Sequence, residues 1–294
     1  MPWLEIRFQS ASAEIEAAEQ LLNQLGACSV SIHDAGDQPV LEPAPGEFPL
    51  WQDLQIRALF EEVDEAKSLT QTIAKELTVD ETLIEHQHIA DQHWETLWMD
   101  DFKPIQFGQQ LWICPSWTEP PNPDAVNLML DPGMAFGSGT HPTTAMCMQY
   151  LDENPPKDLQ VLDYGCGSGV LALASALLGA RHVTGVDIDP QAIISATSNA
   201  KKNNLTEEIF NFYPVNELSA LKCDLLLANI LSETLIQLSN ELKSLVTIGG
   251  NIVLSGVLEY QTEAVVAAYV DGFKITEIKH QDEWVMISAQ KLRD

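Results

Sequence analysis

The chain has 294 residues, of which 45% are hydrophobic and 20% charged, and its formal net charge at pH 7 is -28. This is the composition of a soluble globular protein with room for one large and one smaller domain, and no apolar run approaches the length of a membrane span. So much negative charge repels phosphate backbones, which argues against a nucleic-acid substrate. It would attract a basic partner, although a solvated acidic face that only aids solubility explains the charge slightly better on composition alone.

The cysteines and the N-terminus favour a cytoplasmic protein. The five cysteines are scattered and never spaced C-x-x-C, so neither a disulfide framework nor a zinc site is expected. The first residues carry no basic region before an apolar core, so no secretory signal is expected. His86 and His88 share one face of an expected strand, but no carboxylate and cysteine set completes a metal site there. We therefore expect a cytoplasmic protein with no bound metal and no membrane partner.

Residues 1–90 predict a small α+β domain. Alternating apolar and polar residues indicate four strands, and helical spacing of apolar residues indicates two helices between them. The order β-α-β-β-α-β is typical of the ferredoxin-like fold, and no residue in it has catalytic character. Residues 1–99 hold 4 Lys and Arg against 19 Asp and Glu, so we interpret 1–90 as a substrate-recognition domain. The expected strands are 2–8, 28–32, 54–60 and 82–89, and the expected helices are 12–25 and 64–77.

A linker is expected over 91–125. Residues 91–99 suit a short amphipathic helix, and 102–117 suit a hairpin with its turn at Gly108. The segment 119–123 contains three prolines and breaks the pattern. We therefore place the second domain at 126–294.

Residues 126–294 alternate strands and helices regularly, which predicts a doubly wound, Rossmann-like α/β domain. In such open sheets, ligands bind at the carboxyl ends of the strands. Gly165, Asp187, Asn216 and Asn229 all fall at the ends of expected strands. The expected strands are 160–164, 182–187, 209–215, 224–228 and 250–255 with a closing pair 273–279 and 284–290, and the expected helices are 170–178, 190–203, 232–246 and 259–270.

The stretch 161–170 carries the strongest motif of the chain. An apolar strand ends at Asp163, and Gly165, Gly167 and Gly169 follow before an expected helix. Glycines suit a tight turn that a ligand can approach, and the helix N-terminus offers free N–H groups. Asp187 then ends the next strand, where a ribose would be gripped. The spacing G-x-G-x-G departs from the dinucleotide fingerprint G-x-G-x-x-G, so a nucleoside cofactor is expected and an NAD-dependent dehydrogenase is disfavoured.

A second glycine-rich segment, 131–144, directly precedes an expected helix that begins near Thr144. Its threonine hydroxyls and the free N–H groups of the helix could hold a carboxylate. We name Phe136, Thr140 and Thr144 as candidate cofactor contacts. The alternative is an ordinary capped helix after a flexible loop.

The glycine run preceded by Asp163 resembles the motif of class I methyltransferases that use S-adenosylmethionine. Methyl transfer from a sulfonium is an in-line displacement, which needs a positioned, neutral amine rather than a strong base. The carbonyl of Asn229 is the candidate for orienting the amine, and Asn229 is thus the candidate catalytic residue. His141 could accept a proton, but a role as the cap of the following helix is favoured.

Four blocks of the sequence resemble one family over essentially the whole chain. Residues 130–144, 163–169, 187–190 and 228–231 look like the ribosomal protein L11 methyltransferases of bacteria. The family loop usually reads G-T-G-T-H-P-T-T, and Ser138 departs from it while keeping a hydroxyl. Asn229 is not followed by the prolines of N-P-P-Y enzymes, which argues against methylation of adenine or glutamine amides.

The resemblance implies a function for both domains. It implies that Thr144, Gly165, Asp187 and Asn229 contact S-adenosylmethionine, beside the loop candidates Asp163, Gly167 and Gly169. It implies that the N-terminal domain binds the substrate and moves through the helix 91–99. The expected products are methylated lysine side chains and a methylated N-terminal amine on a basic protein of the large ribosomal subunit.

Two other functions stay open on the sequence. One is a small-molecule methyltransferase whose N-terminal domain acts as a lid. The other is a non-catalytic cofactor-binding protein that docks on ribosome assembly factors. Turnover without any protein acceptor would favour the first, and tight cofactor binding without transfer would favour the second.

Overall fold

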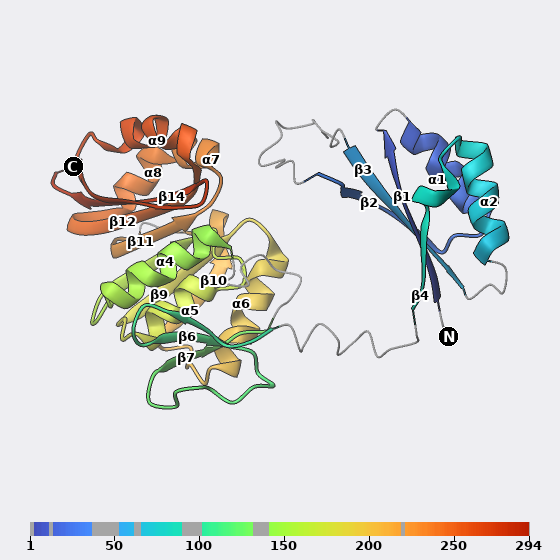
Figure 1. The fold of residues 1–294 in the computed structure, drawn as a ribbon. Helices are drawn as coiled ribbons and strands as arrows, with labels where there is room; N and C mark the ends of the chain where they lie inside the picture. Colours follow the sequence, from blue (N-terminus) through green and yellow to red (C-terminus); the bar gives the residue numbers. More distant parts are fainter. Residues whose placement is uncertain are drawn as a thin grey trace. The chain divides into compact units, whose positions relative to one another are not determined.

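The computed structural model describes residues 3–11, 14–36, 53–61, 66–89, 102–131, 141–218 and 221–293. The chain forms two compact units, Met1–Asp101 and Phe102–Asp294, which are described separately (Figure 1). The expected helix 91–99 and the candidate residues Phe136 and Thr140 lie outside the described residues.

The described residues of the first unit form one antiparallel sheet with two helices. The order β2-β3-β1-β4 places β1 and β3 in the centre, which is a ferredoxin-like arrangement. One apolar core joins alternate residues of β1 and β3 to both helices, so the helices cover the same face. The elements are β1 (Trp3–Ala11), α1 (Ile15–Gln24), β2 (Ser29–Asp34), β3 (Asp53–Glu61), α2 (Ala66–Leu77), the 3₁₀ turn η2 (Glu81–Leu83) and β4 (Glu85–Ile89).

The second unit is built on a seven-stranded sheet with the order β10-β9-β8-β11-β12-β14-β13. Its first five strands are parallel, and β14 runs antiparallel between β12 and β13. The strands are β8 (Gln160–Tyr164), β9 (His182–Asp187), β10 (Phe210–Pro214), β11 (Cys223–Asn229), β12 (Val246–Leu258), β13 (Phe273–Gln281) and β14 (Trp284–Lys291).

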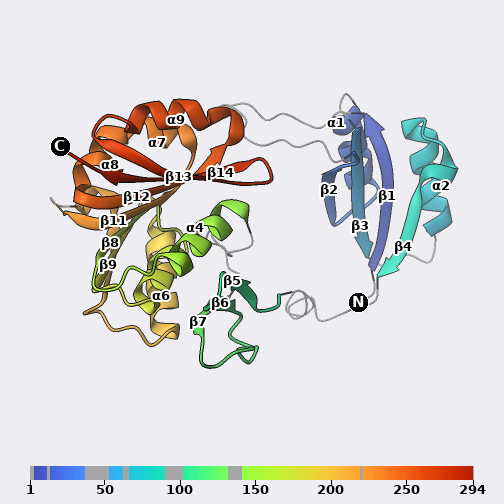
Figure 2. The same ribbon diagram turned by 60° about the vertical axis from the view of Figure 1, so that its left-hand side comes forward.

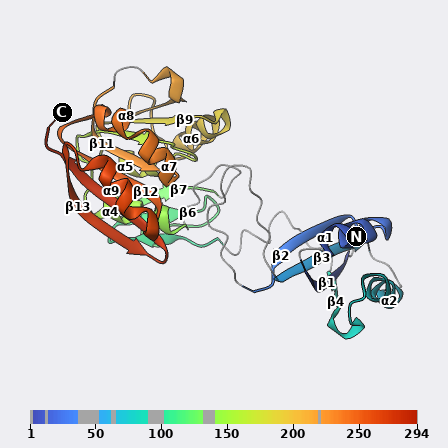
Figure 3. The ribbon, with the colours of Figure 1, turned by 90° about the horizontal axis from the view of Figure 1, so that it is seen from above.

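Helices cover both faces of this sheet. One core contains residues of α4 and α5, with Ala200 of α6, and the other contains residues of α7, α8 and α9. Seen from above, α8 and α9 lie over β11 and β12 (Figure 3). The doubly wound fold predicted from the sequence is therefore confirmed. The helices are α4 (Pro142–Glu153), α5 (Val170–Leu177), α6 (Pro190–Lys202), α7 (Ser232–Gln237), α8 (Ser239–Leu245) and α9 (Thr262–Tyr269), with the 3₁₀ turns η3 (Val215–Glu217) and η4 (Glu259–Gln261).

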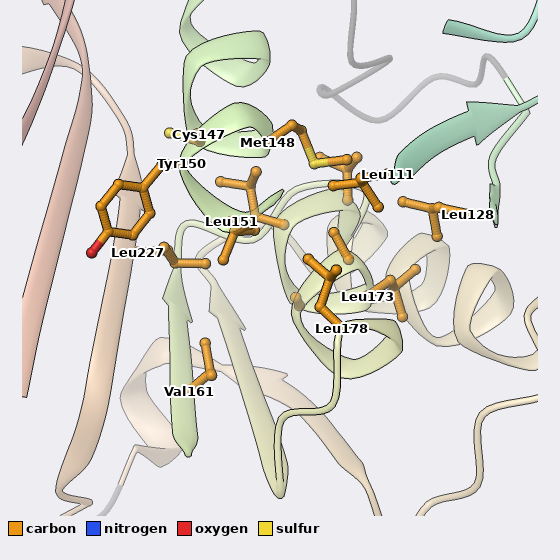
Figure 4. Close-up of a cluster of buried hydrophobic side chains, with 14 of the residues drawn as sticks. Leu111, Leu128, Cys147, Met148, Tyr150, Leu151, Val161, Leu173, Leu178 and Leu227 are labelled. Atoms are coloured by element: carbon orange, nitrogen blue, oxygen red, sulfur yellow. The ribbon is translucent and has the colours of Figure 1, made fainter. Parts of the chain in front are cut away.

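A small three-stranded sheet lies beside α4 (Figure 2). It consists of β5 (Ile105–Phe107), β6 (Leu111–Cys114) and β7 (Val126–Met129), in that order. Leu111 and Leu128 are buried in the same core as Met148 and Leu173, as Figure 4 shows. The described part of the range assigned to a linker, 102–125, thus packs on the second unit, because its apolar strand residues complete that core.

The turn between β5 and β6 is held by a buried carboxylate of α4. Asp152 accepts hydrogen bonds from the backbone N–H groups of Gln109 at 2.6 Å, Gln110 at 2.9 Å and Leu111 at 2.9 Å. Gly108 takes a φ of 68° there, and a Cβ on it would lie 2.1 Å from Oδ2 of Asp152. Glycine is therefore required by both the backbone conformation and the close approach.

Asp152→Ala is expected to lower the free energy of unfolding by about 2–3 kcal/mol, because three N–H groups lose a charged acceptor in a mostly buried place. Urea denaturation monitored by circular dichroism measures the loss. Glu153→Ala is the matched control, since that carboxylate is 53% exposed and, among the described residues, has one ion pair, with Lys279 at 3.4 Å. Its change should stay within about 0.5 kcal/mol. Equal losses in the two variants would contradict the role given to Asp152.

Among the described residues, the helices are too short or too polar to cross a membrane.

Candidate active site

The predicted site residues lie along one edge of the seven-stranded sheet. Asp163 of β8 pairs in register with Leu227 of β11, and Asp187 and Asn229 are the last residues of β9 and β11. Because β8 lies between β9 and β11 and is parallel to both, the carboxyl ends of the three strands meet at the same edge. The convergence expected from the sequence is thus present for these strands.

The three glycines after β8 all have left-handed backbones. The φ angles are 78° at Gly165, 52° at Gly167 and 81° at Gly169. Two of them are also tightly packed: a Cβ on Gly165 would lie 2.4 Å from Cγ2 of Ile230, and one on Gly169 would lie 2.9 Å from Cβ of Ala196. Glycine is therefore required here by the conformation of the turn. It is also required because Ala196 of α6 and Ile230, just after β11, pack closely against the turn.

Asp187 closes the glycine turn from the neighbouring strand. Its Oδ2 accepts a hydrogen bond from the N–H of Gly167 at 2.9 Å, and its Oδ1 accepts one from the N–H of Asp189 at 3.0 Å. The side chain is partly exposed, and each carboxylate oxygen has a second lone pair. Asp187 is thus oriented from both sides and can still accept from two adjacent hydroxyls. Ile188, which follows it, is 85% exposed and offers an apolar surface beside the carboxylate.

Asp163 lies beneath the turn rather than at the surface. It is 1% exposed, and its Oδ2 accepts a hydrogen bond from the N–H of Ala172 in the first turn of α5 at 3.0 Å. Burial is the main cause that raises the pKa of this carboxyl to about 7; the hydrogen bond from Ala172 opposes the rise, and the charge of Asp187 adds to it. In this structure Asp163 therefore fixes the start of α5 against β8.

Asn229 is tied to the start of α4. Its Nδ2 donates a hydrogen bond to Oγ1 of Thr144 at 3.2 Å, across 85 residues of sequence. Thr144 is 3% exposed, so the acceptor is rigidly placed. An amide that donates to Thr144 through Nδ2 holds its Oδ1 on the opposite side. The structure thus gives Asn229 a fixed orientation at the end of the central strand β11.

A comparison with known protein families identifies the family of the chain. The family model described as ribosomal protein L11 methyltransferase (PrmA) matches residues 2–292. The chain belongs to this family. The resemblance stated from the sequence is therefore confirmed, and so are methyltransferase activity and S-adenosylmethionine as the methyl donor of the family.

Proteins of similar sequence align with nearly the full length of the chain. The ribosomal protein L11 methyltransferase of Pseudomonas fluorescens strain Pf0-1 is 47% identical over 293 residues, which are 99% of this chain and 100% of that protein. The protein of the same name from Vibrio cholerae serotype O1 strain O395 is 43% identical over 294 residues, with 99% and 100% covered. A crystal structure of the ribosomal protein L11 methylase of Lactobacillus delbrueckii subsp. bulgaricus has a TM-score of 0.58 and 28% identity, over 65% of this chain and 99% of that chain.

The first turn of α4 in this L11 methyltransferase family member is pinned to two strands. Besides the bond from Asn229, Oγ of Ser255 in β12 donates to the backbone carbonyl of Thr143 at 3.1 Å. The next residue, Gly256, has a φ of 81° at a bulge of β12, and a Cβ there would lie 2.4 Å from the carbonyl oxygen of Ile230. A glycine at the bulge therefore lets β12 pass close to the end of β11.

His141 caps α4, as the sequence favoured. Its Nδ1 accepts a hydrogen bond from the N–H of Thr143 at 3.4 Å and lies 2.8 Å from the hydroxyl of Thr143. Its ring also packs edge-on against Trp284, with 4.9 Å between centroids and 69° between planes. Nothing in the local sequence pattern connects these two residues, because Trp284 lies in β14, more than a hundred residues along the chain.

The structure thus brings together most of the predicted residues. The glycine turn, Asp163 and Asp187 form one cluster, and Thr144 and Asn229 form another at the same edge. Asn216 lies beyond β10 in η3 and is exposed, without a bond to either cluster among the described residues. Ile188, Ser255 and Trp284 were missed by the sequence analysis. Only Ile188 carried a local signal, as an apolar residue directly after the acid that ends a strand.

Asp163→Asn is expected to remove a dependence of stability on pH. The folded-state pKa of about 7 lies above the ordinary value of 3.8, so the folded protein keeps a proton that the unfolded chain loses. Wild-type stability relative to Asp163→Asn should therefore fall as pH rises from about 4 to about 7, and the full penalty is present above pH 7. Between pH 5 and pH 8 the difference in unfolding free energy should change by roughly 2–3 kcal/mol. Urea titrations of both proteins without cofactor measure it, and parallel pH profiles would contradict it.

Proposed function

We propose that this chain transfers the methyl group of S-adenosylmethionine to lysine side-chain amines and the N-terminal amine of ribosomal protein L11. The observation that carries the proposal is the fixed pair Asn229 and Thr144 on the same sheet edge as Asp187. Relatives 43–47% identical over nearly the full chain bear the name of that activity and support the choice of substrate.

The residues at the edge fit the cofactor. Asp187 has an acceptor on each oxygen for the two hydroxyls of a ribose, and the exposed side chain of Ile188 can cover an apolar face of the adenine base. The turn at Gly165, Gly167 and Gly169 leaves room for close approach of a ligand, and we assign Thr144 to the methionine end. Asp163 contributes by holding α5 beneath the turn.

Asn229 orients the acceptor. When bound, S-adenosylmethionine supplies a sulfonium methyl group that a neutral amine attacks in line. The Oδ1 of Asn229 accepts an N–H of that amine, which directs the nitrogen lone pair away from Asn229 and toward the methyl carbon. Thr144 holds the amide in this orientation through its bond to Nδ2. The new C–N bond forms as the C–S bond breaks, and the proton of the resulting ammonium leaves to water.

Charge supports a basic protein as the substrate. The net charge of -28 would attract a ribosomal protein and repel naked RNA. We assign recognition of L11 to the N-terminal domain, 1–90, and place the reaction in the cytoplasm, where ribosomal proteins are made.

Transfer of a labelled methyl group tests the function. The protein is incubated with labelled S-adenosylmethionine and either purified unmethylated L11, ribosomal RNA, or a metabolite extract without protein. Label is expected in L11, on lysine and N-terminal amines located by mass spectrometry. Label only in the metabolite fraction would support a small-molecule methyltransferase. Cofactor binding by calorimetry without label in any fraction would support a non-catalytic protein.

A further inference from the structure

An aromatic pair stands at the active-site edge without a part in the chemistry described so far. His141 caps α4, and its ring packs edge-on against Trp284, the first residue of β14. The ring of His141 is exposed, whereas Trp284 is partly buried and packs against the apolar core on the α4 side of the sheet. The indole of Trp284 is thus held by the apolar core and by the ring of His141.

The position of this pair relative to Asn229 follows from sheet register and helix geometry. Asn229 pairs with Ser255 of β12, and three residues further along β12, Leu258 pairs with Trp284. Trp284 therefore lies beyond the carboxyl ends of the strands, at the same edge as Asn229. His141 stands three residues before Thr144, a spacing that places both on one side of a helix start.

The surroundings of Trp284 are acidic. Glu259 and Glu283 are both exposed, and the N–H of Glu259 donates to the backbone carbonyl of Glu283 at 2.9 Å. Trp284 directly follows Glu283 in the chain. A partly exposed indole with carboxylates around it attracts a cation on an alkyl stem, which is the form in which a lysine side chain arrives.

We propose that Trp284, steadied by His141, is an acceptor-binding residue that holds the alkyl stem and amino group of the incoming amine beside Asn229. The proposal rests on the function proposed above and names one wall of its acceptor site. Contact of the indole face with the stem fixes the angle at which the nitrogen reaches Oδ1 of Asn229. The same face holds the methylated ammonium that forms as the C–N bond is made and the C–S bond breaks, until its proton leaves to water and the neutral methylamine remains.

Four variants of the full chain test this. Trp284→Ala is expected to lower kcat/KM for L11 by 10–100-fold, mainly through KM, while the Kd for S-adenosylmethionine changes less than twofold by calorimetry. Trp284→Phe, which keeps an aromatic face, should retain at least a third of the wild-type kcat/KM. Trp284→Leu replaces the alanine variant if that protein does not fold, because it keeps apolar bulk toward the core. His141→Asn keeps a good helix cap but removes the ring, and a 3–10-fold loss with an unchanged melting temperature is expected.

The outcomes separate the inference from the proposed function. If wild type labels L11 and folded Trp284→Ala or Trp284→Leu does so with kcat/KM within twofold, the function stands and the inference is wrong. Equal losses in Trp284→Phe and Trp284→Ala, or a fall in cofactor affinity that matches the loss of activity, would show that Trp284 acts through packing and would also overturn it. If wild type fails to label L11, the proposed function fails and the inference falls with it.

Discussion

Asn229→Ala is expected to lower kcat for L11 methylation by about 100–1000-fold, because the amine loses the acceptor that directs its lone pair toward the methyl carbon. Cofactor affinity should change less than about threefold, since Asp187, to which we assign the ribose, keeps its bond to Gly167. Single-turnover rates with labelled cofactor measure the chemical step, and calorimetry measures binding. A kcat within tenfold of wild type would remove Asn229 from the catalytic role.

Thr144 provides the matched variants for this experiment. Thr144→Val removes the hydroxyl that accepts from Nδ2 of Asn229 and keeps the shape of the buried side chain. The free amide of Asn229 can then rotate, so we expect a loss of about tenfold in kcat. Thr144→Ser keeps the hydroxyl and should restore most of the rate. If Thr144→Val and Thr144→Ser behave alike, the orienting bond does not matter for the chemistry.

Asp187→Ala is expected to weaken S-adenosylmethionine binding by about 100-fold or more. The variant removes the proposed acceptors of two ribose hydroxyls and also frees the N–H of Gly167, which loosens the glycine turn. Asp187→Asn should be nearly as weak, because one of its two side-chain atoms becomes a donor facing a backbone N–H. Calorimetric titration with the cofactor gives the affinities.

Asp189→Ala is the control for Asp187. Asp189 lies two residues away and caps α6 by accepting from the N–H of Gln191 at 2.9 Å. Its removal should cost about 1 kcal/mol of stability and leave the Kd for the cofactor within threefold. If both variants lose affinity equally, the α6 start and not the carboxylate of Asp187 governs binding.

The sequence alone determined the local parts of the site. The strand, turn and helix at 161–170 follow from an apolar run, three glycines and a helix start, all within ten residues, because backbone conformation depends mainly on near neighbours. The acid that ends the next strand could be placed in the same way. The order of strands and helices in both domains was equally readable, since burial on one face imposes a period of two or 3.6 residues. One expected helix, 232–246, is instead two helices that meet at Leu238.

The tertiary structure decided which distant residues meet. Periodicity shows that a residue faces the core, but neighbours across a sheet depend on strand order and register, which local pattern does not contain. The bond from Asn229 to Thr144 and the ring contact of His141 with Trp284 therefore appeared only in three dimensions. So did the hydrogen bonds from the turn after Gly108 to Asp152, which tie the hairpin of β5 and β6 to α4. The glycines could be found in the sequence because their role is local, whereas the proposed acceptor side of the site combines α4, β11 and β14 and forms only once those elements pack.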